Sequence, residues 1–129
     1  MFQLTKQFTF EAAHRLTHHD GKCARLHGHS WKLRVVLQGE TLASTGPKTG
    51  MLYDYSDISK LVKPLVDDKL DHHYLNESTG LVNPTSEELC HWVFGQLEEK
   101  LPGLIAVEID ETCTCSCRFT REDYKRRRQ

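Results

Sequence analysis

Histidines are concentrated in two short stretches of the sequence. Seven of the eight fall within residues 14–29 and 72–73, and such clustering is typical of a metal site or an acid–base site. His27 and His29 open a predicted strand, where residues two apart share one face at a separation of about 6.6 Å. His14 lies on the apolar face of the neighbouring predicted strand. Three imidazoles with one open position are the ligand set of a catalytic zinc site, so a zinc site is one interpretation of this pattern.

Other interpretations of these residue types remain open. The His-x-His segment could be a pair of ordinary polar residues at a strand start, and His18 and His19 are competing ligands from the adjacent loop. Cys113, Cys115 and Cys117 form a rival metal set, because alternate residues of a strand share a face. The outer two would lie about 13 Å apart, too far to close on one ion without a bend. We therefore expect these cysteines to be small buried side chains.

Three further positions carry groups that could move protons or hold a substrate. Cys23 precedes His27 by four residues, so its thiol would lie near a bound ion as a base, a nucleophile or a fourth ligand. Asp71 directly precedes His72, and a carboxylate beside a histidine can fix the tautomer of the ring. Glu111 could grip a guanidine-like edge with two acceptor oxygens, although its position also suits a plain surface carboxylate.

These groups need a scaffold, and period-two alternation predicts most of it. Phe8 and Phe10 share a face with His14, and glycine and proline within residues 39–50 mark a hairpin connection. Strands are predicted at residues 3–14, 29–38, 51–55, 104–110 and 114–120.

Two helices are predicted between the third and fourth strands. Apolar residues recur at helical spacing from Ile58 to Val66, where Pro64 should cause a kink or a break. Thr85 and Glu88 form a capping box at the start of a second helix, which ends at residues 102–103. The predicted order is βββααββ, an α+β fold whose mostly antiparallel sheet carries two helices on one face. The basic segment 125–129 should fray.

Composition excludes several classes of protein. The 129 residues, 38% hydrophobic and 27% charged, fit one globular domain. The net charge of −1 gives the whole molecule no attraction to nucleic acid or to anionic membranes. The sequence contains no long apolar run and no secretory signal. Five cysteines, an odd number, suggest free thiols in a reducing compartment, so we expect a cytoplasmic protein.

Five segments together resemble the family of 6-pyruvoyltetrahydropterin and 6-carboxytetrahydropterin synthases. They are FTFEAAHRL (8–16), CARLHGHS (23–30), LDHHYLN (70–76), NPTSE (83–87) and ETCT (111–114). The resemblance covers nearly the whole chain, with a pterin synthase domain at 1–120 and a basic tail at 121–129. The three-residue gap between Cys23 and His27 is similar to that of the bacterial 6-carboxytetrahydropterin synthases.

The resemblance implies a role for each motif residue. It implies zinc as the cofactor on His14, His27 and His29, with Cys23 as the catalytic base. It implies that Asp71 and His72 assist this base, and that Glu111 anchors the pterin and belongs to the same relay. In addition to Glu111, the residues expected to contact the pterin are Thr85, Ser86, Glu87 and Thr112.

The resemblance also implies a substrate and an assembly. The substrate is 7,8-dihydroneopterin triphosphate, and the products are 6-carboxytetrahydropterin, acetaldehyde and triphosphate, in the queuosine or 7-deazapurine pathway. The expected fold is the tunnelling fold, assembled as a ring-shaped homo-oligomer (hexamer or tetramer) with active sites at subunit interfaces. Two alternatives remain: a relative that stops at the 6-pyruvoyl product, and a non-catalytic zinc protein whose tail Lys125–Arg128 binds nucleic acid weakly. We do not expect a nucleic-acid or membrane partner.

Overall fold

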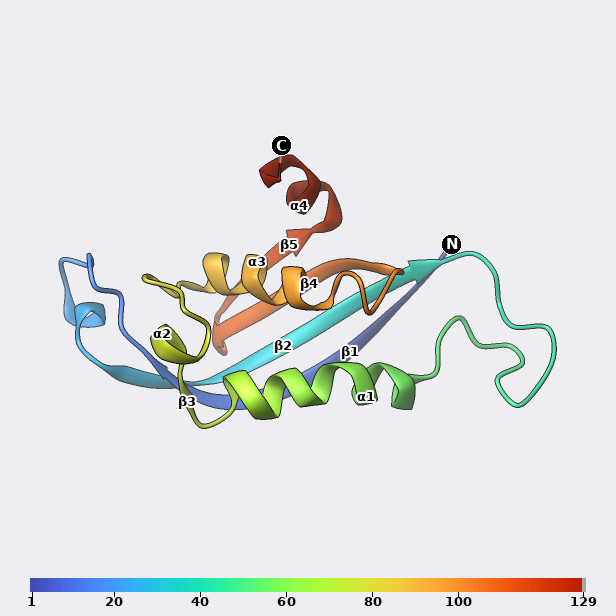
Figure 1. The fold of residues 1–129 in the computed structure, drawn as a ribbon, viewed down its shortest axis with the longest axis horizontal. Coiled ribbons are helices and arrows are strands. Elements are labelled where there is room, and N and C mark those ends of the chain that lie inside the picture. Colours follow the sequence, from blue (N-terminus) through green and yellow to red (C-terminus); the bar gives the residue numbers. More distant parts are fainter. Residues whose placement is uncertain (129) are drawn as a thin grey trace.

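Segments with alternating apolar and polar residues form the long strands of the protein. The structure, a computed structural model, describes residues 1–128. In chain order (Figure 1), its elements are β1 (Phe2–His14), the 3-10 turn η1 (Lys22–Ala24), β2 (His27–Gly39), α1 (Tyr55–Leu65), the π-helical turn η2 (Val66–Leu70), β3 (His73–Tyr74), α2 (Leu75–Ser78), α3 (Ser86–Leu97), β4 (Leu104–Thr112), β5 (Cys115–Thr120) and α4 (Arg121–Arg127). This mixture of elements confirms the predicted α+β class.

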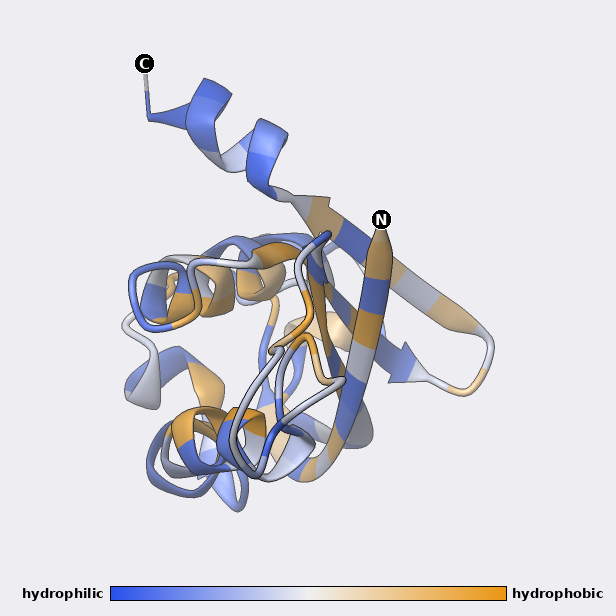
Figure 2. Cartoon of the chain, turned by 90° about the vertical axis from the view of Figure 1, so that its right-hand side faces the viewer, coloured by the Kyte–Doolittle hydropathy of each residue, from blue (hydrophilic) through white to orange (hydrophobic). Residues whose placement is uncertain are grey.

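The five strands form one sheet in the order β3-β1-β2-β4-β5. All neighbours are antiparallel except β3, which pairs in parallel with β1 through only two residues. Helices α1 and α3 lie on the same face of the sheet (Figures 1 and 2). The prediction of a mostly antiparallel sheet with two helices on one face is therefore confirmed.

Strands β1 and β2 form a long antiparallel pair that organises the molecule. Their register runs from Phe2 opposite Gly39 to His14 opposite His27. Because side chains alternate along a strand, Phe10 and Trp31 both face the helices, where they are almost fully buried and stack with ring centroids 5.8 Å apart. The pair thus carries the apolar core at its centre and histidines at one end.

The core lies between the sheet and the two long helices. Helix α3 contributes a buried stripe that includes Leu89, Val93 and Phe94, and α1 contributes Ile58 and Val62. Burying a side chain of this size contributes about 1.5–3 kcal/mol. Figure 2 shows apolar segments both in these helices and in the strands of the sheet.

The predicted third strand at 51–55 is wrong. No strand forms there, and Tyr55 instead begins α1, because the carboxylate of Asp54 accepts a hydrogen bond from the backbone N–H of Ser56 and caps the helix. The segment 40–54 consequently links β2 to α1 rather than to another strand. The third strand of the chain is β3, which has too few residues to leave an alternating pattern.

Two expectations about helix continuity also change. Of the kink or break predicted at Pro64, the break does not occur: α1 continues directly into the π-helical turn η2, where Asp71 donates its backbone N–H to the carbonyl of Val66. The tail is not frayed over the described residues: α4 begins with a complete capping box between Thr120 and Asp123. Gln129, the last residue of the expected tail, lies outside the described residues. Across residues 1–128, no helix is long and apolar enough to cross a membrane.

Candidate metal centre and its surroundings

Three histidines converge at the end of the β1–β2 pair. His14 lies directly opposite His27, and His29 lies opposite Ala12, so all three side chains project from the face that carries the helices. The ring centroids are 4.6 Å apart for His14 and His27, 4.9 Å for His27 and His29, and 5.1 Å for His14 and His29. The structure thus brings together the three residues that the sequence predicts as ligands.

Backbone carbonyls fix the orientation of two of these rings. Nδ1 of His14 donates to the carbonyl of Pro84 at 2.8 Å, and Nδ1 of His27 donates to the carbonyl of Arg25 at 2.7 Å. A proton on Nδ1 leaves a lone pair on Nε2, which is the form of imidazole that binds a metal ion. Neither contact is indicated by the residue types alone, and that of His14 also requires the fold to bring residue 84 beside residue 14.

The Nε2 atoms of the three histidines are buried and make no hydrogen bond within residues 1–128, although a carboxylate oxygen of Glu111 lies close to two of them. Burial lowers the pKa of His14 and of His29 from the ordinary histidine value, which favours the neutral, metal-binding form. A buried polar atom without a partner is costly, and three that face one another indicate a missing common partner. The donor set suits a metal ion.

Glu111 completes this group. One of its carboxylate oxygens, Oε1, lies 3.0 Å from Nε2 of His29 and 3.3 Å from Nε2 of His14. One ligand atom from each of the four side chains fits within 4.8 Å of the others, so the group could hold a metal ion. Nitrogen and carboxylate donors in a four-membered set fit zinc.

The local structure of β4 explains why Glu111 points inward. It shares strand parity with Val107 and Ile109, which are fully buried, and the pairing of β4 with β5 shifts register between residues 110 and 112. The preceding Asp110 faces the other side and is held by the guanidinium of Arg34 at 2.6 and 3.0 Å. Glu111 is therefore not a plain surface carboxylate. The sequence carried a signal for this, because Glu111 alternates in step with the apolar residues Val107 and Ile109.

Cys23 lies in the loop between β1 and β2, next to the histidines. It lines a pocket of about 370 Å³ that His27 and His29 also line. The loop is fixed by hydrogen bonds from the N–H of Leu16 to the carbonyl of Cys23 and from Nε of Arg15 to the carbonyl of Ala24. Cys23 is half-buried, so a substrate in this pocket could reach its thiol.

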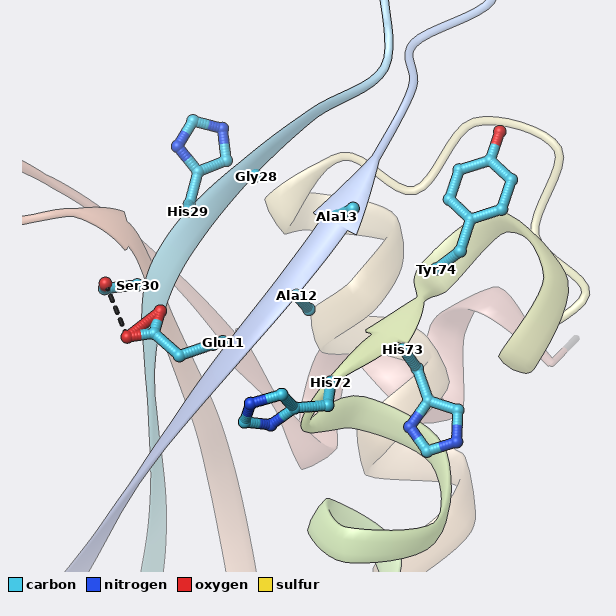
Figure 3. A pocket seen from close by; sticks show the side chains of 9 residues that line it. All are labelled: Glu11, Ala12, Ala13, Gly28, His29, Ser30, His72, His73 and Tyr74. Carbon is cyan, nitrogen blue, oxygen red and sulfur yellow. Dashed lines mark hydrogen bonds between the residues drawn. The ribbon is translucent and has the colours of Figure 1, made fainter.

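Asp71 and His72 lie at the junction of η2 and β3. Asp71 accepts hydrogen bonds from the N–H of Glu11 at 2.8 Å and from Nδ1 of His72 at 2.9 Å, and the Glu11 bond is the main cause that lowers the pKa of this carboxyl. His72 has a left-handed backbone, with φ of 59°, and an 80% exposed side chain. It lines an open pocket of about 580 Å³ with Glu11 and Ser30 (Figure 3).

The described chain does not bring all the expected catalytic residues into one pocket. The pocket of Cys23 is lined by neither Asp71 nor His72. Figure 3 shows His72 beside Glu11, which is hydrogen-bonded to Ser30 on the strand face opposite to that of the ligand histidines. The predicted assistance of Cys23 by Asp71 and His72 therefore stays a prediction, since the described residues place the pair at a different pocket.

The residues expected to contact a pterin also lie at two different places in the fold. Thr85 caps α3 by accepting a hydrogen bond from the N–H of Glu88, but the predicted capping box is incomplete because the N–H of Thr85 donates to the carbonyl of Asn83, and Ser86 donates to Glu87 in the first turn. Thr112 instead lines a pocket of about 310 Å³ together with Glu111 and His29. This pocket adjoins the metal group directly.

The rival ligands lie elsewhere. Cys113 lies in the turn between β4 and β5 and Cys115 is the first residue of β5, so both are exposed, against expectation, whereas Cys117 is half-buried. The cysteines form no group that could hold a metal among the described residues. His19 does not belong to the metal group, and its Nδ1 accepts a hydrogen bond from the N–H of Gly21.

The fold and the site together define a class of protein: an α+β domain with a histidine–carboxylate metal centre and adjoining pockets at one end of its sheet. Residues 3–122 match the family model described as 6-pyruvoyl tetrahydropterin synthase. The chain belongs to this family and is one of its enzymes, as the five sequence segments predict.

Individual relatives refine this result. The chain is 51% identical over 120 residues to the 6-carboxy-5,6,7,8-tetrahydropterin synthase of Synechocystis sp., covering 92% of this chain and 93% of that one. It is 32% identical to the enzyme of the same name from Haemophilus influenzae, over 92% and 99% of the two chains. The structure of 6-pyruvoyl tetrahydropterin synthase from Caenorhabditis elegans superposes with a TM-score of 0.78 at 27% identity, over 92% and 94% of the chains. The tunnelling fold is thereby confirmed.

Proposed function

We propose that the chain is a zinc-dependent 6-carboxytetrahydropterin synthase, a carbon–carbon lyase of the queuosine or 7-deazapurine pathway. It would convert 7,8-dihydroneopterin triphosphate to 6-carboxytetrahydropterin, acetaldehyde and triphosphate. The observation that carries this proposal is the 51% identity to a relative of that name along almost the whole chain. The convergence of three unpartnered Nε2 atoms supports the metal.

His14, His27 and His29 would hold the zinc ion. The bound ion would supply Lewis-acid polarisation of substrate oxygens. The protein presets the ligands, since the carbonyls of Pro84 and Arg25 keep the protons of two rings on Nδ1. Because both carbonyls are backbone groups, the orientation of the rings does not depend on a second side chain.

Cys23 would act as the base that moves protons on the substrate side chain. It lies in the pocket that His27 and His29 also line. Asp71 and His72 would assist it from a second copy of the chain. Their hydrogen-bonded pair stands at an exposed edge of the fold, which supports an active site shared across an interface in a ring-shaped homo-oligomer.

Glu111 would anchor the pterin ring in the pocket that it shares with Thr112. Its carboxylate can accept two hydrogen bonds from the amino and N–H edge of the ring, and charge-assisted bonds of this kind are strong. Thr85, Ser86 and Glu87 would complete the wall, and the hydroxyl of Thr85, which accepts the cap hydrogen bond of α3, can still donate its own proton to a ligand. Near zinc, Glu111 is also a candidate fourth ligand.

Residues 1–120 would form the catalytic domain, with 121–129 as an extension, in a cytoplasmic enzyme. The five free cysteines support a reducing compartment. A nucleic-acid role for the extension is not favoured, because its arginines already have acidic neighbours. Arg126 pairs with Asp123, and Arg127 lies 3.6 Å from Glu88.

The deciding experiment combines zinc quantification with product analysis. The purified enzyme should contain one zinc ion per chain and should release acetaldehyde and triphosphate in equal amounts from dihydroneopterin triphosphate. A second candidate activity, formation of the 6-pyruvoyl product, is favoured by the match to the Caenorhabditis elegans structure. Release of triphosphate without acetaldehyde would establish that activity instead. Turnover unchanged after removal of zinc would refute the role of the metal.

A further inference from the structure

The pockets that adjoin the metal group differ in charge. The pocket of Cys23 contains the cationic side chains of Lys22 and Arg25 and no carboxylate. The pocket of Glu111 contains two carboxylates and one lysine. The open pocket beside His72 contains Glu11 and neither lysine nor arginine. An anionic group that approaches the metal group is therefore attracted to the first pocket and repelled by the other two.

Lys22 and Arg25 are available for a ligand. Both side chains are exposed, and neither forms an ion pair among the first 128 residues, whereas Arg34, Arg118 and Arg121 all pair with carboxylates. Their backbone is well fixed, because the N–H of Arg25 donates to the carbonyl of Lys22 and the carbonyl of Arg25 accepts from His27. Two free cations are thus held on a short turn that ends at a ligand histidine.

We propose that Lys22 and Arg25 bind the triphosphate of the substrate, an assignment that rests on the proposed function and adds a polyphosphate subsite to it. The pocket of Glu111 and the pocket of Cys23 share only His29. The two pockets therefore adjoin each other at the metal group. In the substrate, the hydroxylated side chain similarly joins the pterin ring to the triphosphate. The ring lies against Glu111, the hydroxyls lie at the metal centre, and the phosphates lie against the cations.

The chemistry of the two side chains suits this ligand. The guanidinium of Arg25 can bind two phosphate oxygens through parallel hydrogen bonds, and the ammonium of Lys22 acts as a compact point charge. The exposed position of both allows the triphosphate product to leave into solvent. The subsite also explains how Cys23, which lies between these cations in the sequence, comes to face the side chain of the substrate.

The test measures the contribution of the triphosphate to binding separately from that of the pterin ring. In a Cys23→Ala background, which prevents turnover, calorimetry would compare the affinities for dihydroneopterin triphosphate and for dihydroneopterin. A charge-assisted hydrogen bond corresponds to roughly a 10-fold change in affinity or more. Lys22→Gln and Arg25→Gln should each weaken triphosphate binding by about 10-fold, and the double variant by about 100-fold. Binding of dihydroneopterin should not change.

The matched control is Lys63→Gln with Lys69→Gln, which removes the same charge from exposed positions outside the pocket. The charge-preserving variants Lys22→Arg and Arg25→Lys should retain most of the affinity. This result would show that the losses in the Gln variants come from the missing charge and not from a folding defect. Equal losses in the control variant, or an unchanged ratio of the two affinities in the double variant, would overturn the subsite.

Inorganic triphosphate tests the pocket independently of the proposed reaction. It should bind the wild-type enzyme, compete with the substrate and lose affinity in the double variant, with zinc content measured before and after because this anion chelates metals. If dihydroneopterin binds to no variant while inorganic triphosphate still depends on Lys22 and Arg25, the proposed function fails and the polyphosphate subsite stands. If inorganic triphosphate binds the double variant as tightly as the wild type, the subsite fails.

Discussion

At the scale of single residues, the protonation and position of a few side-chain atoms decide what the site can bind. His14 is fully buried, and its Nε2 faces two other nitrogens that also lack partners. We predict that His14→Ala loses the zinc ion, as measured by elemental analysis of the purified protein. His29→Ala, at a less buried ligand, should lose it too, whereas the exposed loop variant His18→Ala should retain it. Full zinc occupancy in His14→Ala would move the ligand role to His18 or His19.

Glu111 is the residue for which geometry allows two roles. Its Oε1 lies 3.0 Å from a ligand histidine, yet its pocket also suits a pterin ring. In Glu111→Gln, an amide donor faces the N–H of the ring, so binding of dihydroneopterin should weaken by about 10-fold or more. Zinc content should not change if anchoring is the role. Glu108→Gln, on the opposite face of the same strand, is the control for affinity, and loss of zinc in Glu111→Gln would identify Glu111 as a ligand.

At the scale of elements, α4 shows how a short capped helix adds to the fold. Thr120 and Asp123 form its capping box, and the ring of Tyr124 lies 5.0 Å from that of Phe94 in α3. We predict that Thr120→Ala lowers the free energy of unfolding by about 1 kcal/mol, the usual cost of losing an N-cap. Urea denaturation would measure it. Lys125→Gln, an exposed change in the same helix, should have little effect, and equal stability of both variants would mean that α4 is frayed in solution.

At the scale of the whole molecule, the proposed sharing of Cys23, Asp71 and His72 between two chains can be tested by mixing inactive subunits. A mixture of Cys23→Ala and His72→Asn subunits, each inactive alone, should recover activity after subunit exchange, because some shared sites receive both intact residues. Asn is chosen for position 72 because it tolerates the left-handed backbone there. Light scattering should show a homo-oligomer, since β3 and β5 leave both edges of the sheet without a neighbour within the described chain. A mixture that stays inactive would place the whole site in one subunit.

The sequence by itself determined whatever depends on local pattern or on distinctive motifs. Alternation located β1, β2, β4 and β5, and it placed His14 on the apolar face, because neighbouring side chains of a strand must point to opposite sides. The spacing of His27 and His29 was sufficient to suggest a shared ion. Five short segments identified the family, because their residue types and order together are far more specific than any one of them.

Tertiary structure alone decided what depends on contacts between distant segments. Pattern failed for the strand expected at 51–55, where the carboxylate of Asp54 starts a helix instead, and for β3, whose two residues pair only because η2 delivers them to β1. It also could not place the carbonyl of Pro84 against His14, or Glu111 against His29, since these pairs are 70 and 82 residues apart. Such contacts follow from packing of the sheet against its helices, which no local sequence window contains.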